Sequence, residues 1–101
     1  MVNLNTDMID FFVEKQKIGI EDKQMQLERI EEEFRELAFA GFMETEKREL
    51  EEAVDVLVTV FVYLKILGVK WSEVEKEFER KMVINMRKPV REGKGIKVKK
   101  E

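Results

Sequence analysis

The spacing of apolar and polar positions along the chain predicts four helices. Their approximate ranges are residues 6–17, 21–42, 44–68 and 72–88. The second range shows the pattern most clearly, with the 3-4-3 spacing of one helical face at Leu27, Ile30, Phe34 and Leu37. Beyond the fourth range, the alternation of Ile96 and Val98 fits a short extended piece.

The predicted helix ends carry residues with known preferences for those positions. Thr6 is suited to cap the first helix, and Ser72 with Glu75 matches a capping box at the start of the fourth. Gly68 is placed to follow the end of the third helix, and Pro89 cannot continue the fourth. Since short connections make successive helices antiparallel, we expect an all-α, four-helix bundle over residues 1–88 and a basic tail over residues 89–101.

Composition limits both the size of the core and the available chemistry. A chain of 101 residues builds one thin core and often completes it by forming an oligomer. The absence of Cys and His excludes disulfides, thiol nucleophiles, imidazole zinc sites and the Ser-His-Asp triad. The longest apolar run, about 12 residues, is shorter than the roughly 20 that a membrane helix needs. With no signal peptide visible, we expect a cytoplasmic protein without a membrane partner.

The net charge of −3 is unevenly distributed. Residues 87–101 contain seven basic and two acidic side chains, whereas the rest of the chain contains 12 basic and 20 acidic ones. The tail is interpreted either as a solvated terminus or as a segment that reaches phosphate groups. A nucleic-acid adaptor is the weaker hypothesis, because the acidic body would repel a duplex.

Asp55 stands out in the third helix, because residues 53–64 are apolar apart from Asp55 and Thr59. A helix that is apolar on all sides is normally buried, and a buried carboxylate needs a partner. At about 100° per residue, Glu52, Asp55 and Thr59 share one stripe. Asp55 is therefore expected to be buried and either to pair with a Lys or Arg from another helix or to bind a cation.

The second helix offers more carboxylates. Glu33 and Glu36 are one turn apart, and apolar residues flank them on both sides. On antiparallel neighbours, these two residues and the pair Glu52 and Asp55 can bring four carboxylates together, which repel one another unless cations are bound. Oxygen ligands without His or Cys suit Mg²⁺, with Mn²⁺ as the other possibility. The pattern leaves open whether Glu32 takes part and how many ions bind.

The fourth helix places Lys81 and Asn85 one turn apart, on the stripe that also carries Val74 and Phe78. In that position they suit phosphate ligands beside a metal, and Arg87 follows. The alternative is that the Lys81 side chain extends past the edge of the core to solvent.

These residues together resemble a known family. Glu32-Glu33-x-x-Glu36 followed by Glu52-x-x-Asp55 is similar to the EExxE…ExxD signature of the MazG-like, all-α nucleoside triphosphate pyrophosphohydrolases. This superfamily includes dimeric dUTPases, dCTP pyrophosphatases and phosphoribosyl-ATP pyrophosphohydrolase. The segment 81–87 looks like the family's Lys-x-x-x-Asn-x-Arg, especially that of the dCTP pyrophosphatases, and the resemblance covers about residues 25–89.

The resemblance implies a Mg²⁺-dependent enzyme that cleaves a nucleoside or deoxynucleoside triphosphate to the monophosphate and pyrophosphate, with house-cleaning of non-canonical or excess nucleotides as its role. It implies that Mg²⁺ is bound by the catalytic carboxylates Glu33, Glu36, Glu52 and Asp55. It implies that phosphates are bound by Lys81, Asn85 and Arg87. It also implies a MazG-like bundle that assembles as a homodimer or as a dimer of dimers.

Two departures from the family pattern limit what can be carried over. The spacing from Asp55 to Lys81 is about three residues longer than usual, which weakens the phosphate assignments. Thr59 stands where the family often has an aromatic residue of the base pocket, so base preference cannot be carried over. Other aromatic residues are candidates for base stacking or for the core and interface: Phe11, Phe12, Tyr63 and Trp71. The alternative function is a non-catalytic helical dimer that binds a nucleotide or a protein.

Overall fold

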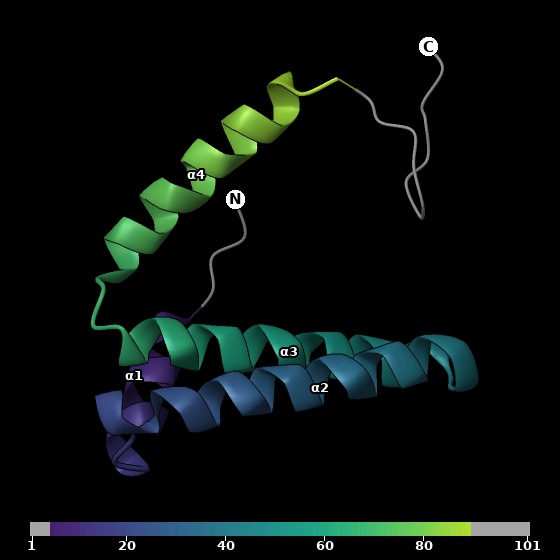
Figure 1. The fold of residues 1–101 in the computed structure, drawn as a ribbon, viewed down its shortest axis with the longest axis horizontal. Helices are drawn as coiled ribbons and strands as arrows, with labels where there is room; N and C mark the ends of the chain where they lie inside the picture. Colours follow the sequence, from purple (N-terminus) through teal and green to yellow (C-terminus); the bar gives the residue numbers. More distant parts are fainter. Residues whose placement is uncertain (1–4, 90–101) are drawn as a thin grey trace. The chain divides into compact units, whose positions relative to one another are not determined.

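The computed structural model describes residues 5–89, and these residues form four α-helices and one short 3-10 turn, without a strand. The elements are α1 (Thr6–Lys15), η1 (Ile20–Asp22), α2 (Lys23–Met43), α3 (Glu46–Ile66) and α4 (Trp71–Arg87) (Figure 1). The all-α prediction is confirmed. The basic tail from residue 90 and the extended piece at Ile96 and Val98 lie outside the described residues. No helix in the described part combines the length and apolar character needed to cross a membrane.

The described chain divides into two compact units at the start of α4, between Trp71 and Ser72. The first unit contains α1, η1, α2 and α3. Within it, α2 and α3 are two 21-residue helices that lie side by side, joined by the short turn at Glu44 and Thr45 (Figure 1). The Thr45 hydroxyl accepts a hydrogen bond from the Arg48 amide at 3.3 Å, so Thr45 is the N-cap of α3.

The predicted helix ends are only partly correct. Gly68 follows α3 with a φ of +77°, as expected for the residue after a helix. Thr6 is the first residue of α1, but Asn5 holds the cap position without a side-chain hydrogen bond. Ser72 does not cap α4, because the helix already begins at Trp71. Trp71, the first residue of α4, donates its indole N–H to Asp10 at 3.0 Å, and its ring lies edge-on to Phe61 at a centroid distance of 6.0 Å.

A buried polar contact sets the register of α2 against α3. The Gln26 amide donates to the Thr59 carbonyl at 2.9 Å, and the Thr59 hydroxyl donates to the Val56 carbonyl at 2.7 Å. Gln26 and Thr59 are both buried. A buried amide without a partner would destabilise the fold, so this contact favours one alignment of the two helices.

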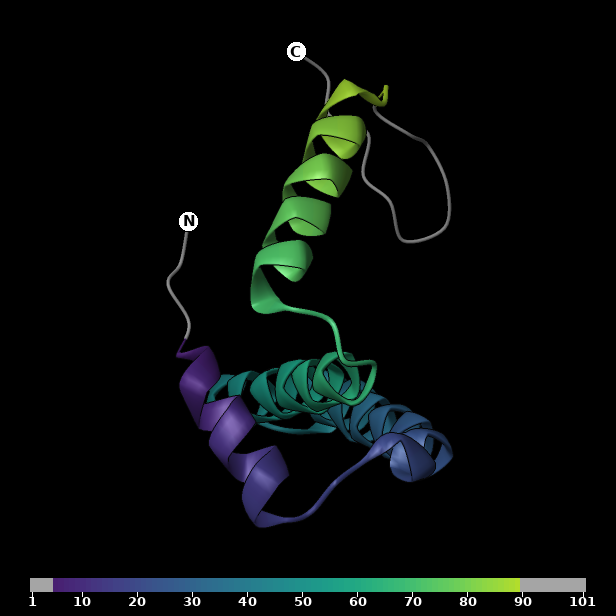
Figure 2. The same cartoon turned by 90° about the vertical axis from the view of Figure 1, so that its left-hand side faces the viewer.

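The apolar core lies where α1 crosses the end of the α2–α3 pair (Figure 2). Val13 of α1 packs with Val62 and Ile66 of α3, and Ile9 and Ile18 cover them. At the edge of this core, the Lys65 ammonium lies 2.9 Å from Asp10 of α1. The core is small, as expected for a chain of this length.

The predicted buried faces are wrong for the single chain. The apolar row of α2 that was expected to form the seam is partly exposed, with Phe34 60% exposed, while Gln26 and Ala40 are buried instead. On α3, Val54 and Leu57 are exposed rather than enclosed. Both helices are apolar on two sides, and one neighbouring helix covers only one of them.

Candidate metal centre

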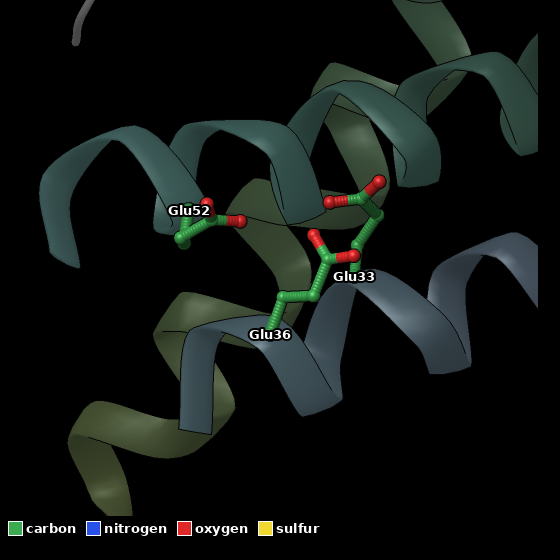
Figure 3. A group of neighbouring side chains, drawn as sticks. All are labelled: Glu33, Glu36 and Glu52. Carbon is green, nitrogen blue, oxygen red and sulfur yellow. The ribbon is translucent and has the colours of Figure 1, made fainter. Parts of the chain in front are cut away.

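Three carboxylates meet in the seam between α2 and α3. Glu33 and Glu36 project from α2 and Glu52 from α3, and their carboxylate groups face one another (Figure 3). One oxygen from each lies within 4.8 Å of the others. The i, i+3 spacing places the two α2 residues on one face, and the antiparallel partner supplies the third. The structure thus brings together three of the four predicted metal ligands, which we call the carboxylate cluster.

Two oxygens of the carboxylate cluster are buried without a hydrogen-bond partner. They are Oε2 of Glu33 and Oε2 of Glu52. The Glu33 side chain is 13% exposed, and Glu52 as a whole is 5% exposed. Buried charged oxygens without partners destabilise a fold and call for an ion or another donor.

Each of these two carboxylates is paired with an arginine through its other oxygen. Arg48 lies 2.6 Å from Oε1 of Glu52, and Arg29 lies 3.6 Å from Oε1 of Glu33. Arg48 also contacts Glu51 at 2.6 Å and Glu44 at 3.1 Å. Sequence reasoning missed both arginines, although the i, i+4 spacing of Arg29 to Glu33 and of Arg48 to Glu52 is a usable signal.

The arginines do not fully balance the carboxylates. Repulsion from Glu33 raises the pKa of Glu36, and burial adds to this rise. Burial also raises the pKa of Glu52, while Arg48 acts to lower it and the charges of Glu36 and Asp55 act to raise it further. Both shifts favour protonation, which means that the site disfavours its own negative charge and favours a bound cation.

Asp55 lies on α3 one turn after Glu52, and its expected burial is wrong. Asp55 is exposed in the single chain, although Glu52 and Thr59 of the same stripe are buried. Its carboxylate lies outside the carboxylate cluster, although its charge acts on Glu52. Within residues 5–89 Asp55 forms no ion pair, so the alternative of a Lys or Arg partner is not met in that range. Its role as a fourth ligand stays a prediction.

The donor set fits a hard divalent cation. All donors are carboxylate oxygens, they lie within the reach of one ion, and two of them are buried without another partner. Mg²⁺ prefers oxygen ligands and commonly binds through a few carboxylates while keeping several waters. Glu33, Glu36 and Glu52 are therefore the residues that would hold the ion.

Two pockets flank the carboxylate cluster along the α2–α3 seam. The turn-side pocket has a volume of about 390 Å³ and is lined by Arg35, Glu36, Phe39, Glu44, Arg48 and Glu52. The α1-side pocket, of about 410 Å³, lies at the other end of the seam. Its lining residues are Phe12, Gln16, Lys17, Ile18, Asp22, Met25, Gln26, Arg29, Val58, Thr59 and Val62. The acidic centre therefore has a pocket of two arginines and three glutamates on one side and a mixed apolar and polar pocket on the other.

The predicted phosphate ligands Lys81, Asn85 and Arg87 all lie on α4, in the second unit, and are exposed. The charges of Arg80 and Lys81 lower the pKa of Glu77, with the Arg80 hydrogen bond as the main cause. The phosphate role of the three residues stays a prediction.

The aromatic candidates for base stacking have different surroundings. Trp71 is held by Asp10 and Phe61, so it belongs to the packing at the end of α3. Phe12 lines the α1-side pocket, whereas Phe11 is largely exposed. Phe12 therefore lies in a pocket at the α1 end of the α2–α3 seam.

Comparison with known proteins adds one match. The model of the phosphoribosyl-ATP pyrophosphohydrolase family matches residues 8–82, about three quarters of the chain. The matched range contains the carboxylate cluster, Asp55 and Lys81, and it ends before Asn85 and Arg87. No curated protein and no solved structure matches the chain.

Proposed function

Because the chain belongs to the phosphoribosyl-ATP pyrophosphohydrolase family, a family of enzymes that hydrolyse a pyrophosphate bond, we propose that it converts phosphoribosyl-ATP to phosphoribosyl-AMP and pyrophosphate. The observation that carries this proposal is the carboxylate cluster with its two unpartnered buried oxygens. The expected house-cleaning role is corrected here, since the family name describes one defined substrate rather than a range of aberrant nucleotides.

The cation is proposed to be Mg²⁺, with Mn²⁺ as the alternative, held by Glu33, Glu36 and Glu52 and joined by Asp55 as a fourth ligand. When bound, such an ion neutralises phosphate charge and lowers the pKa of a bound water. Glu36 is the exposed member of the carboxylate cluster, so it is the member that solvent reaches most easily. It is the residue best placed to accept a proton from the attacking water.

The turn-side pocket supports a binding site for the leaving pyrophosphate. Arg48 and Arg35 line it next to Glu36 and Glu52. Both guanidinium groups contact glutamates, Arg35 through Glu31 and Arg48 through Glu44, Glu51 and Glu52. Guanidinium groups bind phosphate oxygens in pairs, so a pyrophosphate would compete for these donors. Lys81, Asn85 and Arg87 are proposed as further phosphate ligands from α4.

The exposed apolar residues of α2 and α3 support the proposal that the chain works as a homodimer or homotetramer. Phe34, Phe39, Val54 and Leu57 are each at least two fifths exposed. Soluble proteins rarely leave such a set uncovered, and a second copy would cover it.

The assay that tests the proposal measures pyrophosphate release from phosphoribosyl-ATP with Mg²⁺, beside ATP, dCTP and dUTP. Phosphoribosyl-ATP is expected to have the highest kcat/KM. Release of inorganic phosphate instead, or no turnover of any substrate, would contradict the proposal and favour a non-catalytic binding protein. A preference for dCTP or dUTP would support the pyrophosphohydrolase reaction but contradict phosphoribosyl-ATP as the substrate.

Matched variants assign the residues. Glu52→Gln is expected to reduce kcat at least about 100-fold, because it removes a metal ligand and its charge. The control Glu49→Gln changes an exposed residue of the same helix and is expected to leave kcat unchanged. Arg48→Met is expected to reduce kcat/KM about 10-fold or more through loss of charge-assisted hydrogen bonds, with Arg80→Met on α4 as its control. If Arg48→Met and Arg80→Met have equal kcat/KM, Arg48 does not bind the substrate.

A further inference from the structure

The α1-side pocket lies at the meeting point of α1, the segment after it, α2 and α3, and no step of the proposed reaction uses it. Its walls combine apolar side chains, among them Phe12, Met25 and Val62, with the amide of Gln26. Its volume of about 410 Å³ falls in the range of small-molecule sites. A flat ring with polar substituents suits this lining.

One residue links the lining of the pocket to the carboxylate cluster. Arg29 lines the pocket and also forms the ion pair with Glu33 at 3.6 Å. Along α2, Gln26 in the pocket precedes Glu33 by seven residues, which corresponds to about 10 Å along the helix axis. A nucleotide whose reacting phosphate lies at the carboxylate cluster can therefore place its base in this pocket, with the ribose between them.

Lys17, at the rim, has an unusual backbone conformation for a lysine. Its φ is +54°, and it follows the end of α1 in the position that glycine normally takes. Two backbone hydrogen bonds close the turn, from Lys17 to Glu14 at 3.1 Å and from Ile18 to Val13 at 3.0 Å. A side chain is strained in this region, whereas Gly or Asn is tolerated.

The charge of Lys17 is not used within the fold. No carboxylate in residues 5–89 pairs with it, whereas Arg29 in the same pocket is paired with Glu33. A strained residue with an unused charge at the edge of a pocket is better explained by a ligand than by stability.

Resting on the proposed function, we propose that the α1-side pocket binds the adenine and the attached phosphoribosyl group of the substrate, and that the Lys17 ammonium binds the 5′-phosphate of that group. This phosphate is an anionic group that phosphoribosyl-ATP has and ATP lacks. Lys17 is then a specificity residue that distinguishes the two nucleotides.

The test compares the ratio of kcat/KM for phosphoribosyl-ATP to kcat/KM for ATP in wild type, Lys17→Asn and Lys15→Gln. Lys15 lies on α1, is exposed and does not line the pocket, so its variant removes the same charge elsewhere. In Lys17→Asn the ratio is expected to fall about 10-fold or more, the effect of losing a charge-assisted hydrogen bond. A ratio within about twofold of the Lys15→Gln value overturns the proposal.

A binding experiment without metal separates this proposal from the proposed reaction. Phosphoribosyl-AMP and AMP are titrated into wild type and Lys17→Asn, and the NMR signals of the Met25, Val58 and Val62 methyl groups are followed. Phosphoribosyl-AMP is expected to shift these signals in wild type and to bind about 10-fold more weakly to Lys17→Asn. If wild type does not turn over phosphoribosyl-ATP, the proposed reaction is wrong. The expected binding of phosphoribosyl-AMP would then still support the proposed pocket. Shifts that avoid these methyl groups overturn the pocket whatever the activity.

Discussion

Removal of divalent cations is expected to destabilise the fold as well as to stop turnover. Glu33, Glu36 and Glu52 place carboxylate oxygens within 4.8 Å of one another, and two of these residues have a buried oxygen without a partner. In the unfolded chain these groups separate and are hydrated. The metal-free folded state therefore retains a repulsion that a bound cation removes.

The size of the effect follows from mass action. A cation that binds only the folded state at 100 times its Kd stabilises that state by about 2.7 kcal/mol. For a domain of 60–100 residues, 1 kcal/mol shifts Tm by about 4–8 °C, so the expected rise on adding Mg²⁺ is about 10–20 °C. General screening by salt gives no such saturating response.

The assay is thermal unfolding followed by far-ultraviolet circular dichroism, with EDTA or with increasing Mg²⁺, and with NaCl of matched ionic strength as the salt control. Glu33→Gln should melt at a higher temperature than wild type in EDTA, because one of the repelling charges is gone, and should respond less to Mg²⁺. Glu28→Gln, an exposed change on the same helix, should behave as wild type does. A wild-type Tm that is the same in EDTA and in saturating Mg²⁺ would refute the reasoning.

Three further predictions concern the described fold. In EDTA, Tm should rise as the pH falls from 7 toward 5. The folded state raises the pKa of Glu36 and of Glu52 above the ordinary value, so protonation of these two groups stabilises the fold. A fall in Tm over that pH range would contradict this prediction. Gln26→Leu should lower the free energy of unfolding by about 1 kcal/mol in urea melts through loss of its buried hydrogen bond, whereas the exposed control Gln24→Leu should change it by less than about 0.5 kcal/mol. Gly68→Ala should cost about 1–2 kcal/mol in the same assay from its positive φ alone, since a Cβ there meets nothing within 4 Å.

The helices and part of the site were predictable because their signals are local. Residue spacing along each helix is preserved by folding, so the i, i+3 relation of Glu33 to Glu36 indicates a shared face whatever the partner. The short connection at Glu44 and Thr45 makes α2 and α3 antiparallel neighbours, which brings Glu52 to that face. These two steps need no long-range information.

The choice of buried face was not predictable in the same way. The row containing Leu27 and Phe34 is more apolar than the row containing Gln26 and Glu33, yet the second row faces α3. The outcome depends on a match between Gln26 and Thr59, which lie 33 residues apart in sequence. Because both sides of α2 carry apolar residues, periodicity identifies two candidate faces, and apolar content alone ranks them in the wrong order.

The distribution of apolar walls along the seam gives the proposed substrate one orientation. Each pocket is lined by two cations, but the turn-side pocket adds three glutamates and one apolar side chain, whereas the α1-side pocket adds one aspartate and five apolar side chains. The base therefore fits the α1-side pocket, and the two phosphates that leave are left with the guanidinium groups of Arg35 and Arg48, which bind phosphate oxygens in pairs. With the bond to be broken over the carboxylate cluster, the pyrophosphate then points toward the α2–α3 turn and the base toward α1. The reverse orientation would place a base among arginines and glutamates and a pyrophosphate against Phe12 and Val62, which leaves both ends with unfavourable surroundings.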